Sequence, residues 1–397
     1  AYWSSGVQQL RAQAEAGGVP VAFLPGDSRP DPELDYLSTI STARCHGLAA
    51  YLDAGGPDNA SSFLAAARDI IDDRDTAPPP RPLLRAGIYW PGRETPDLAV
   101  LREEWAEGAP VAAIVFYRAL VQAGDLAPVD AMVTACRNAG LNPLPIFSAS
   151  LKDGESAPIV ADLLRRGGVD VILNMTSFAV SDPAGTGDDM PGLASAGPFG
   201  AVDAPVLQLV LSASRETDWQ ESVAGLTARD LAMNVALPEL DGRILSRAVG
   251  FKKPPQRHPL THAMTTAYEG QDERAAYVAR LAAGWARLRH RPPAEKRIAL
   301  IMANYPNRDG RLANGVGLDT PESVMQTMNS LADAGYGIAH APANSAALVA
   351  DLRAGPTNQG WQGRVCDAVM PNAAYLAHFN SLPAALRNEV TTRWGAP

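Results

Sequence analysis

Between residues 111 and 174 the chain reads VAAIVFYRALVQAGDLAPVDAMVTACRNAGLNPLPIFSASLKDGESAPIVADLLRRGGVDVILN. Three apolar runs in this stretch are strand candidates, at residues 111–117, 144–147 and 169–174. The segments between them have apolar residues at helical spacing, with Pro128 and Pro158 at helix starts and Gly140 at a helix end. Strands that alternate with helices of similar length predict right-handed crossovers and a parallel, doubly wound α/β sheet.

The same rhythm continues on both sides of this stretch. Further strands are expected at residues 86–90, 206–211, 231–237 and 244–249. Residues 181–202 are rich in Gly, Ala, Ser and Asp and are expected to form a surface or site-covering loop. A helix is expected before residue 290, with Tyr277, Leu281, Trp285 and Leu288 on one face.

Proline-rich breaks at residues 78–82 and 291–293 indicate domain boundaries. Short strands are also expected at residues 19–24 and 298–302, and the opening residues read as a helix already under way. We therefore expect a part of something larger, built of Rossmann-like modules with parallel sheets that helical segments join. The predicted parts are the tail of an N-terminal α/β domain (1–30), a helical segment with a Pro-rich linker (31–82), a Rossmann-like α/β domain (83–255), a helical connector (256–295) and the start of a second, incomplete α/β module (296–397).

Bulk composition narrows the class of protein. The chain has 397 residues, 46% of them hydrophobic and 19% charged, which is ordinary for a globular protein. A formal net charge of -9 does not suggest nucleic-acid binding. Cys45, Cys136 and Cys366 are widely spaced, which argues against a disulfide framework and favours a cytoplasmic setting. No run approaches the roughly 18 apolar residues that a membrane span needs.

The segment most suited to a site is NYPNRDGRLANGVGLDTPES at residues 304–323, directly after the strand expected at 298–302. Ligands of doubly wound sheets bind beyond the carboxyl ends of strands. Asp319 or Thr320 can cap the next helix, with Pro321 in its first turn, and that helix start favours anions. A plain glycine-rich turn before a capped helix is the alternative. The segment fits neither a Walker loop nor a dinucleotide fingerprint, so ATP hydrolysis is not expected in this chain.

Other candidate residues follow predicted strands. Tyr117 and Arg118 end the strand at 111–117, and Arg118 could pair with a substrate carboxylate. Glu239 and Asp241 follow the strand expected at 231–237 and could accept protons or bind metal. An ordinary structural role is the alternative for each. His258 and His262 are four residues apart, but Pro259 between them favours a polar loop over a metal site.

The segment at 304–323 resembles the large subunits of the cobaltochelatase and magnesium chelatase family. Four further stretches resemble the cobalt branch in the same order: LPGD at 24–27, VFYRAL at 115–120, VALPELDGR at 235–243 and GFK at 250–252. The most specific matches are NYPNRDGR at 304–311 and NGVGLDTP at 314–321. The ordered series spans about 280 residues and resembles the cobalt enzymes more than the magnesium enzymes.

The resemblance implies a three-component enzyme of cobalamin biosynthesis. Its large subunit would hold a tetrapyrrole, hydrogenobyrinic acid a,c-diamide, and receive Co²⁺. ATP and Mg²⁺ would bind to partner subunits, one an AAA+ ATPase and one with an integrin-like domain. Two alternatives remain open: the H-type large subunit of a magnesium chelatase, which inserts Mg²⁺ into protoporphyrin IX, and a non-catalytic, periplasmic-type small-molecule binding module.

The expected site residues divide by role, and the metal ligands stay unassigned. The expected catalytic residues are Asp309, Glu239 and Asp319. The expected substrate-binding residues are Asn304, Tyr305, Arg308, Gly310, Asn314, Gly315, Gly317, Thr320, Tyr117 and Arg118.

Overall fold

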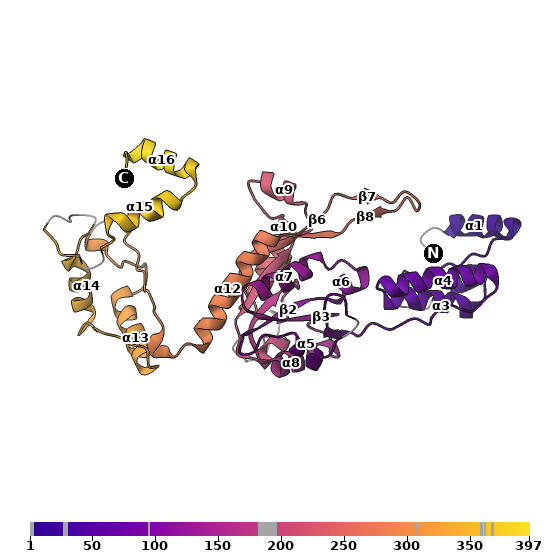
Figure 1. Cartoon of the computed structure of the whole chain (residues 1–397), viewed down its shortest axis with the longest axis horizontal. Coiled ribbons are helices and arrows are strands. Elements are labelled where there is room, and N and C mark those ends of the chain that lie inside the picture. The colour runs from indigo at the N-terminus through magenta and orange to yellow at the C-terminus, as the bar shows by residue number, and fades with distance from the viewer. Residues whose placement is uncertain are drawn as a thin grey trace. The chain divides into compact units, whose positions relative to one another are not determined.

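The computed structural model of the protein describes residues 4–26, 31–93, 96–181, 197–305, 309–357, 360, 363–366 and 369–397. The chain divides into two units, Ala1–His290 and Arg291–Pro397 (Figure 1). All strands in the described part of the chain belong to the first unit. The five-part division expected from the sequence is finer than these two units and stays a prediction.

A seven-stranded sheet lies at the centre of the first unit, in the order β1-β3-β2-β4-β5-β6-β9. Its strands are β1 (Ala86–Ile88), β2 (Val111–Tyr117), β3 (Asn142–Ser148), β4 (Val169–Asn174), β5 (Val206–Leu211), β6 (Ile244–Lys252) and β9 (Tyr268–Gly270). The strands from β2 to β6 run parallel, whereas β1 and β9 are antiparallel strands at the two edges. The mainly parallel α/β sheet confirms the predicted fold class. A separate hairpin joins β7 (Gln256–Arg257) to β8 (Met264–Thr265).

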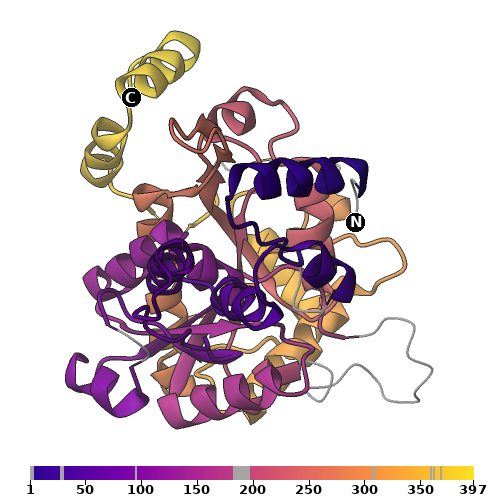
Figure 2. The same cartoon turned by 90° about the vertical axis from the view of Figure 1, so that its right-hand side faces the viewer.

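Helices cover both faces of this sheet (Figures 1 and 2). On one face α7 (Ala127–Asn138) packs on β2 and β3, and α12 (Asp272–His290) packs on β4, β6 and α7. On the other face α8 (Ser156–Gly167) contacts β1, β3 and β4. Shorter helices join the strands, namely α5 (Leu98–Glu103), α6 (Arg118–Ala123), η2 (Gly197–Ala201) and α9 (Glu216–Glu221). This layering explains why the central strands read as continuous apolar runs.

Small residues form most of the buried face of α12. Of the four larger residues expected on one face, Tyr277 and Leu288 are 38% and 44% exposed. The residues that α12 buries are Ala275, Val278, Ala279, Ala282, Ala283 and Ala286. A stripe of alanines lets α12 approach α7 and the sheet closely, and Leu281 and Trp285 are partly buried against the same core.

Four helices precede the linker of the first unit: α1 (Ser4–Gly17), α2 (Pro32–Leu37), α3 (Thr42–Ala54) and α4 (Pro57–Asp72). The strand expected at residues 19–24 does not form. This segment runs beside Ser38 and Thr39, where Thr39 N donates to the Val21 carbonyl at 2.9 Å and Val21 N donates to Thr39 Oγ1 at 2.7 Å. The hydroxyls of Ser38 and Thr39 accept from backbone N–H groups of this segment. In a sheet, a neighbouring strand would supply those acceptors.

Residues 231–237, expected as a strand, are helical. They span the end of α10 (Ala228–Leu231), a π-helix (η3, Ala232–Ala236) and the start of α11 (Leu237–Glu239). Thr227 begins this helical run as its N-cap, because its hydroxyl accepts from Asp230 N at 3.1 Å. Short apolar runs fit a helix as well as a strand, and here the capped helix prevails.

The second unit is built from helices and loops. Its helices are η4 (Pro293–Glu295), η5 (Asp309–Arg311), α13 (Thr320–Asp333), α14 (Ser345–Ala354), α15 (Asn372–Ser381) and α16 (Ala384–Trp394). The strand expected at residues 298–302 is wrong: the segment is not paired, and Ile301 is 94% exposed. A strand needs a neighbour to pair its backbone, and the described residues of this unit contain no other strand.

Most of the loop expected at 181–202 lies outside the described residues, and its described end forms η2. Among the helices that the structure describes, none combines the length and the apolar character needed to cross a membrane.

Candidate functional site

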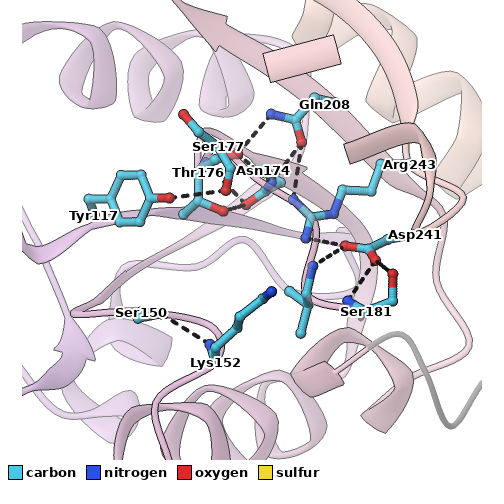
Figure 3. Close-up of polar contacts among 11 residues, drawn as sticks. Tyr117, Ser150, Lys152, Asn174, Thr176, Ser177, Ser181, Gln208, Asp241 and Arg243 are labelled. Carbon is cyan, nitrogen blue, oxygen red and sulfur yellow. Dashed lines mark hydrogen bonds and ion pairs between the residues drawn. The ribbon is translucent and has the colours of Figure 1, made fainter. Parts of the chain in front are cut away.

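Strands β2, β3 and β4 end at one edge of the sheet, and polar residues follow each of them. A pocket of about 260 Å³ lies at this edge. It is lined by Tyr117, Ser150, Leu151, Lys152, Thr176, Ser177, Phe178, Ala179 and Val180. Figure 3 shows how the polar side chains around it gather. The carboxyl ends of parallel strands are where doubly wound sheets bind ligands, and we call this pocket the strand-end pocket.

A network of buried amides lies beside the strand-end pocket. Asn174, at the end of β4, donates through Nδ2 to Gln208 Oε1 at 2.7 Å. Gln208 in turn donates through Nε2 to the Thr176 carbonyl at 2.9 Å, and Thr176 Oγ1 donates to Asn174 Oδ1 at 2.9 Å. All three residues are buried. The network fixes the chain where it leaves β4, because each buried amide has a partner that only this arrangement supplies.

Asp241 and Arg243 form a buried ion pair next to this network. Arg243 Nη2 lies 2.7 Å from Asp241 Oδ2, and the side chains of Arg243 and Asp241 are 0% and 2% exposed. Arg243 Nη1 also lies 3.5 Å from Gln208 Oε1 (Figure 3). Burial lowers the pKa of Arg243 from its usual value, although the charge of Asp241 opposes that shift. The pair therefore stays ionised as a unit and joins the network to the segment just before β6.

Asp241 also holds the turn that borders the strand-end pocket. It accepts from Val180 N at 2.7 Å, from Ser181 N at 3.0 Å and from Ser181 Oγ at 2.5 Å. Burial opposes ionisation of Asp241, but these hydrogen bonds and the charge of Arg243 outweigh it and keep its pKa below the usual value. The carboxylate is thus a charged acceptor for backbone and hydroxyl donors.

Tyr117 and Asn234 hold the start of the same turn. The Tyr117 hydroxyl donates to the Ser177 carbonyl at 3.0 Å, and Ser177 Oγ donates to Asn234 Oδ1 at 2.7 Å. Burial raises the pKa of Tyr117, so this phenol remains protonated and a hydrogen-bond donor near neutral pH. The structure thus places Tyr117, the last residue of β2, at the strand-end pocket, and its expected role in substrate binding stays a prediction.

Lys152 supplies the positive charge of the strand-end pocket. It follows β3 in a turn where its own N–H donates to Ser150 Oγ at 3.1 Å. Its side chain extends toward the polar residues of the other strand ends (Figure 3). The ammonium forms no ion pair with any residue in the described part of the chain. It is therefore available to a carboxylate or carboxamide oxygen of a ligand.

A larger cavity of about 500 Å³ lies between the helical segment, the linker and α7. In it the Tyr89 hydroxyl donates to Asp130 Oδ1 at 2.8 Å, and burial raises the pKa values of both groups. Asn59 bridges the cavity wall by donating to the carbonyls of Gly55 and Arg81. These groups are mostly occupied with one another, so the cavity offers fewer free polar groups than the strand-end pocket.

Two predicted site residues of the first unit lie elsewhere. Arg118 donates through Nε to the Leu84 carbonyl and through Nη2 to the Leu83 carbonyl, both at 3.0 Å. Its guanidinium therefore holds the linker. Glu239 is exposed at the end of α11. Neither is brought to the strand-end pocket, and their expected roles stay predictions.

The predicted site residues of the second unit lie in and around η5. Asp309 is 9% exposed and accepts from Thr357 Oγ1 at 3.1 Å. Its other oxygen, Oδ1, is buried with no hydrogen-bond partner among the described residues. Asn304 forms an isolated antiparallel bridge with Leu312 across this turn. Arg308 lies outside the described residues.

The rest of this segment forms tight turns before α13. Asp319 caps α13 by accepting from Glu322 N at 3.1 Å, as its spacing predicts. Gly317 has a φ of +74°, and a Cβ on Gly315 would lie 2.8 Å from Thr320 Oγ1, so both positions require glycine. Five predicted residues of this segment are exposed, namely Tyr305, Gly310, Asn314, Gly317 and Asp319.

The described part of the chain contains no group of three or more His, Cys, Asp or Glu side chains placed to hold a metal ion. His258 and His262 lie in the turn of the β7–β8 hairpin, where His262 N donates to the His258 carbonyl at 2.9 Å. His262 has a φ of +58°. The prediction of a polar loop there is confirmed.

The sequence analysis missed most of the groups around the strand-end pocket, notably Asn174, Gln208, Asn234 and Lys152. Gln208 carried a signal, because it is the one polar residue in the apolar run VLQLVL of β5. A buried amide in a central strand requires a partner. Asn234 gave no such signal, since its segment was expected to be a strand.

Comparison with known proteins decides the family. Residues 49–397 match the model of the family described as CobN/Magnesium Chelatase. The chain belongs to this family. In the CobN branch, it is 42% identical to the aerobic cobaltochelatase subunit CobN of Sinorhizobium sp, over 98% of this chain. It is 40% identical to the subunit of the same name from Pseudomonas aeruginosa, over 100% of this chain.

The chain is also similar to a more distant relative and to a solved structure. The H-type magnesium-chelatase subunit of Rhodobacter capsulatus is 26% identical over 87% of this chain. A solved structure, the catalytic subunit of cobaltochelatase from Mycobacterium tuberculosis, matches 100% of this chain with a TM-score of 0.76 and 30% identity. The chain spans 31% of the length of that structure and of both CobN relatives.

Proposed function

We propose that the chain is part of the tetrapyrrole-binding large subunit of a cobalt chelatase. The reaction is ATP-dependent insertion of Co²⁺ into hydrogenobyrinic acid a,c-diamide during aerobic cobalamin biosynthesis. The difference in sequence identity supports cobalt over magnesium. The chain is 42% and 40% identical to the two CobN subunits but 26% identical to the H-type magnesium-chelatase subunit. The similarity covers nearly the whole chain, so it supports a shared role for both units.

The strand-end pocket is the proposed place for one edge of the tetrapyrrole. Its volume of about 260 Å³ is below the roughly 300–1,000 Å³ of pockets that enclose a whole ligand, so it suits a peripheral side chain of the macrocycle. Lys152 is matched to a carboxylate, and the Tyr117 and Ser177 hydroxyl oxygens, whose protons are already donated within the protein, can accept from a carboxamide N–H. Hydrogenobyrinic acid a,c-diamide carries both kinds of group at its rim.

Metal insertion needs a base, because ring N–H protons leave as the metal binds, one from a corrin and two from a porphyrin. Asp309 is the best-supported base in this proposal, since one of its buried oxygens has no partner among the described residues. Asp319 and Glu239 are the further proposed catalytic carboxylates. Binding of substrate in the second unit is assigned to Asn304, Tyr305, Arg308, Gly310, Asn314, Gly315, Gly317 and Thr320. In the first unit, Arg118 joins Tyr117 as a proposed substrate-binding residue.

ATP hydrolysis is assigned in this proposal to partner subunits, an AAA+ ATPase and a subunit with an integrin-like domain. They would act with the large subunit in the cytoplasm. Co²⁺ is a substrate of this reaction, delivered to a macrocycle whose nitrogens become its ligands. This chain would bind and orient the macrocycle and accept its protons.

Reconstitution with the partner subunits tests the proposal. The large subunit at the full length of its family is mixed with both partners, ATP and one tetrapyrrole, and metal insertion is followed by absorbance. We expect Co²⁺ insertion into hydrogenobyrinic acid a,c-diamide that stops when ATP is left out. Insertion of Mg²⁺ into protoporphyrin IX instead would assign the chain to the magnesium branch. No ATP-dependent insertion into either would favour a binding module.

A further inference from the structure

Phe178 has an unusual combination of backbone strain and exposure. It follows β4, lines the strand-end pocket and has a φ of +68°, a region that bulky side chains rarely adopt. Its side chain is 50% exposed. Strain of this kind persists only where the surroundings impose it, and it often marks a ligand-binding position. Folding thus spends free energy to hold an aromatic ring at the mouth of a polar pocket.

The π-helix supplies the contact that imposes this strain. Phe178 N–H donates to the Met233 carbonyl at 2.9 Å. That carbonyl is free because Leu237 N–H bonds to the Ala232 carbonyl, as in a π-helix, and the next amide in that pattern belongs to Pro238, which has no N–H. Because Pro238 has no N–H, the Met233 carbonyl has no helical donor and can accept from the Phe178 N–H.

The residues on both sides of Phe178 are held as firmly. Tyr117 and Asn234 bind Ser177, and Asp241 accepts from Val180 N at 2.7 Å. Together with the bond from Phe178 to Met233, these contacts fix the turn from 177 to 180 to separate parts of the fold. These contacts hold the backbone of Phe178, so the point from which the exposed ring projects is set before any ligand arrives.

We propose that Phe178 is a stacking platform for the face of a conjugated tetrapyrrole whose rim group enters the strand-end pocket beside Lys152. This inference rests on the proposed function and adds a substrate-binding residue to it. Aromatic rings stack on flat conjugated systems in offset geometry, and an exposed ring gains further from the water released. An exposed ring on a held backbone, beside a cation and several hydroxyls, matches a ligand with an apolar face and a polar rim.

Equilibrium titration of Phe178 variants with hydrogenobyrinic acid a,c-diamide tests this inference. The large subunit at the full length of its family is used, and binding is followed by the absorbance and fluorescence of the tetrapyrrole. Phe178→Gly removes the ring and also relieves the positive φ, so the variant is expected to fold. Phe178→Tyr keeps the ring. Tyr36→Ala removes an aromatic ring that is 78% exposed on α2, outside the strand-end pocket, and serves as the control.

We expect Phe178→Gly to raise the Kd by roughly 10- to 100-fold, the range for loss of one stacked, newly buried ring. Phe178→Tyr and Tyr36→Ala should stay within about threefold of wild type, and the Tm of Phe178→Gly should not fall. An unchanged Kd for Phe178→Gly would overturn the stacking role. A lower Tm with an unchanged Kd would show that the ring packs against protein instead. Failure of the wild-type subunit to bind any tetrapyrrole would overturn the proposed function itself, and this inference with it.

Discussion

At the scale of single residues, Asp241 links the turn that borders the strand-end pocket to the rest of the sheet. A buried ion pair is weak evidence of stability, because two charges lose their hydration when they are buried. The carboxylate of Asp241 nevertheless accepts from Val180 and Ser181 in addition to Arg243, so it couples the turn after β4 to the start of β6. Loss of this carboxylate should release the turn and leave Arg243 buried without a countercharge.

We predict that Asp241→Asn lowers the free energy of unfolding by about 3–5 kcal/mol, the cost of an unpaired buried charge. Urea denaturation followed by circular dichroism measures it. The double variant D241L/R243M should recover part of this loss, because it removes both charges but leaves the Val180 and Ser181 donors without their acceptor. A loss below about 0.5 kcal/mol for Asp241→Asn would show that the pair does not stabilise the fold.

The pH dependence of the difference in unfolding free energy between wild type and Asp241→Asn tests whether the Asp241 carboxylate causes that difference. The folded pKa of Asp241 is lowered, so its stabilisation is fully present above the unfolded pKa of about 3.9 and is lost as pH falls through the folded value. The difference between wild type and Asp241→Asn should therefore shrink below about pH 4. A difference that stays constant down to about pH 2 would assign the effect to something other than this carboxylate.

Residue-level prediction from sequence relies on where a residue stands along a strand. Tyr117 ends β2 and lies at the strand-end pocket, while its role in binding stays a prediction. Arg118, one residue later, points to the linker carbonyls of Leu83 and Leu84, which no sequence pattern indicates. Asn174 and Gln208 meet because β4 and β5 are neighbours in this register, and register between strands is not a local property.

At the scale of elements, the π-helix is the device that shapes the site. The apolar run at 231–237 suggested a strand, and periodicity alone cannot separate a short buried strand from a short helix. Alanines at 228, 232 and 236 recur at helical spacing and were the signal available. The π-turn itself depends on Pro238, which frees the carbonyl that binds Phe178.

We predict that Pro238→Ala loosens the turn at Phe178. An alanine at this position has an amide N–H, which can donate to the Met233 carbonyl in the π-helical pattern or to the Asn234 carbonyl in the α-helical pattern. In the first case it competes with the Phe178 N–H for the same acceptor. Loss of one hydrogen bond, worth about 1 kcal/mol, should speed amide exchange at Phe178 roughly fivefold. Hydrogen exchange resolved to single amides measures this, with the amides of β2 as the unchanged reference. Equal protection of the Phe178 amide in both proteins would exclude Pro238 as the cause of the strained turn.

Strand prediction succeeded or failed according to whether partners were close in the sequence. Strands β2, β3 and β4 were predicted because long apolar runs recur with helices between them. The runs at 19–24 and 298–302 have similar composition, but they have no partner strand in the described residues of their surroundings. Pairing depends on what lies beside a segment in space, and composition does not report that.

At the scale of the whole molecule, the first unit carries the strand-end pocket and the second carries the segment at 304–323 that identifies the family. That segment was informative in the sequence because several rare residues occur in fixed order, and two of its glycines and its helix cap have clear conformational reasons. The pocket was only partly visible in the sequence, since buried amides from different strands build its wall.

The most direct measurement is an equilibrium titration of the large subunit, at the full length of its family, with two tetrapyrroles in parallel. We predict that hydrogenobyrinic acid a,c-diamide binds with a lower Kd than protoporphyrin IX. We also predict that Lys152→Ala, which removes the cation of the strand-end pocket, weakens that binding about tenfold through loss of a charged hydrogen bond. Binding of protoporphyrin IX without binding of hydrogenobyrinic acid a,c-diamide would contradict the assignment to the cobalt branch.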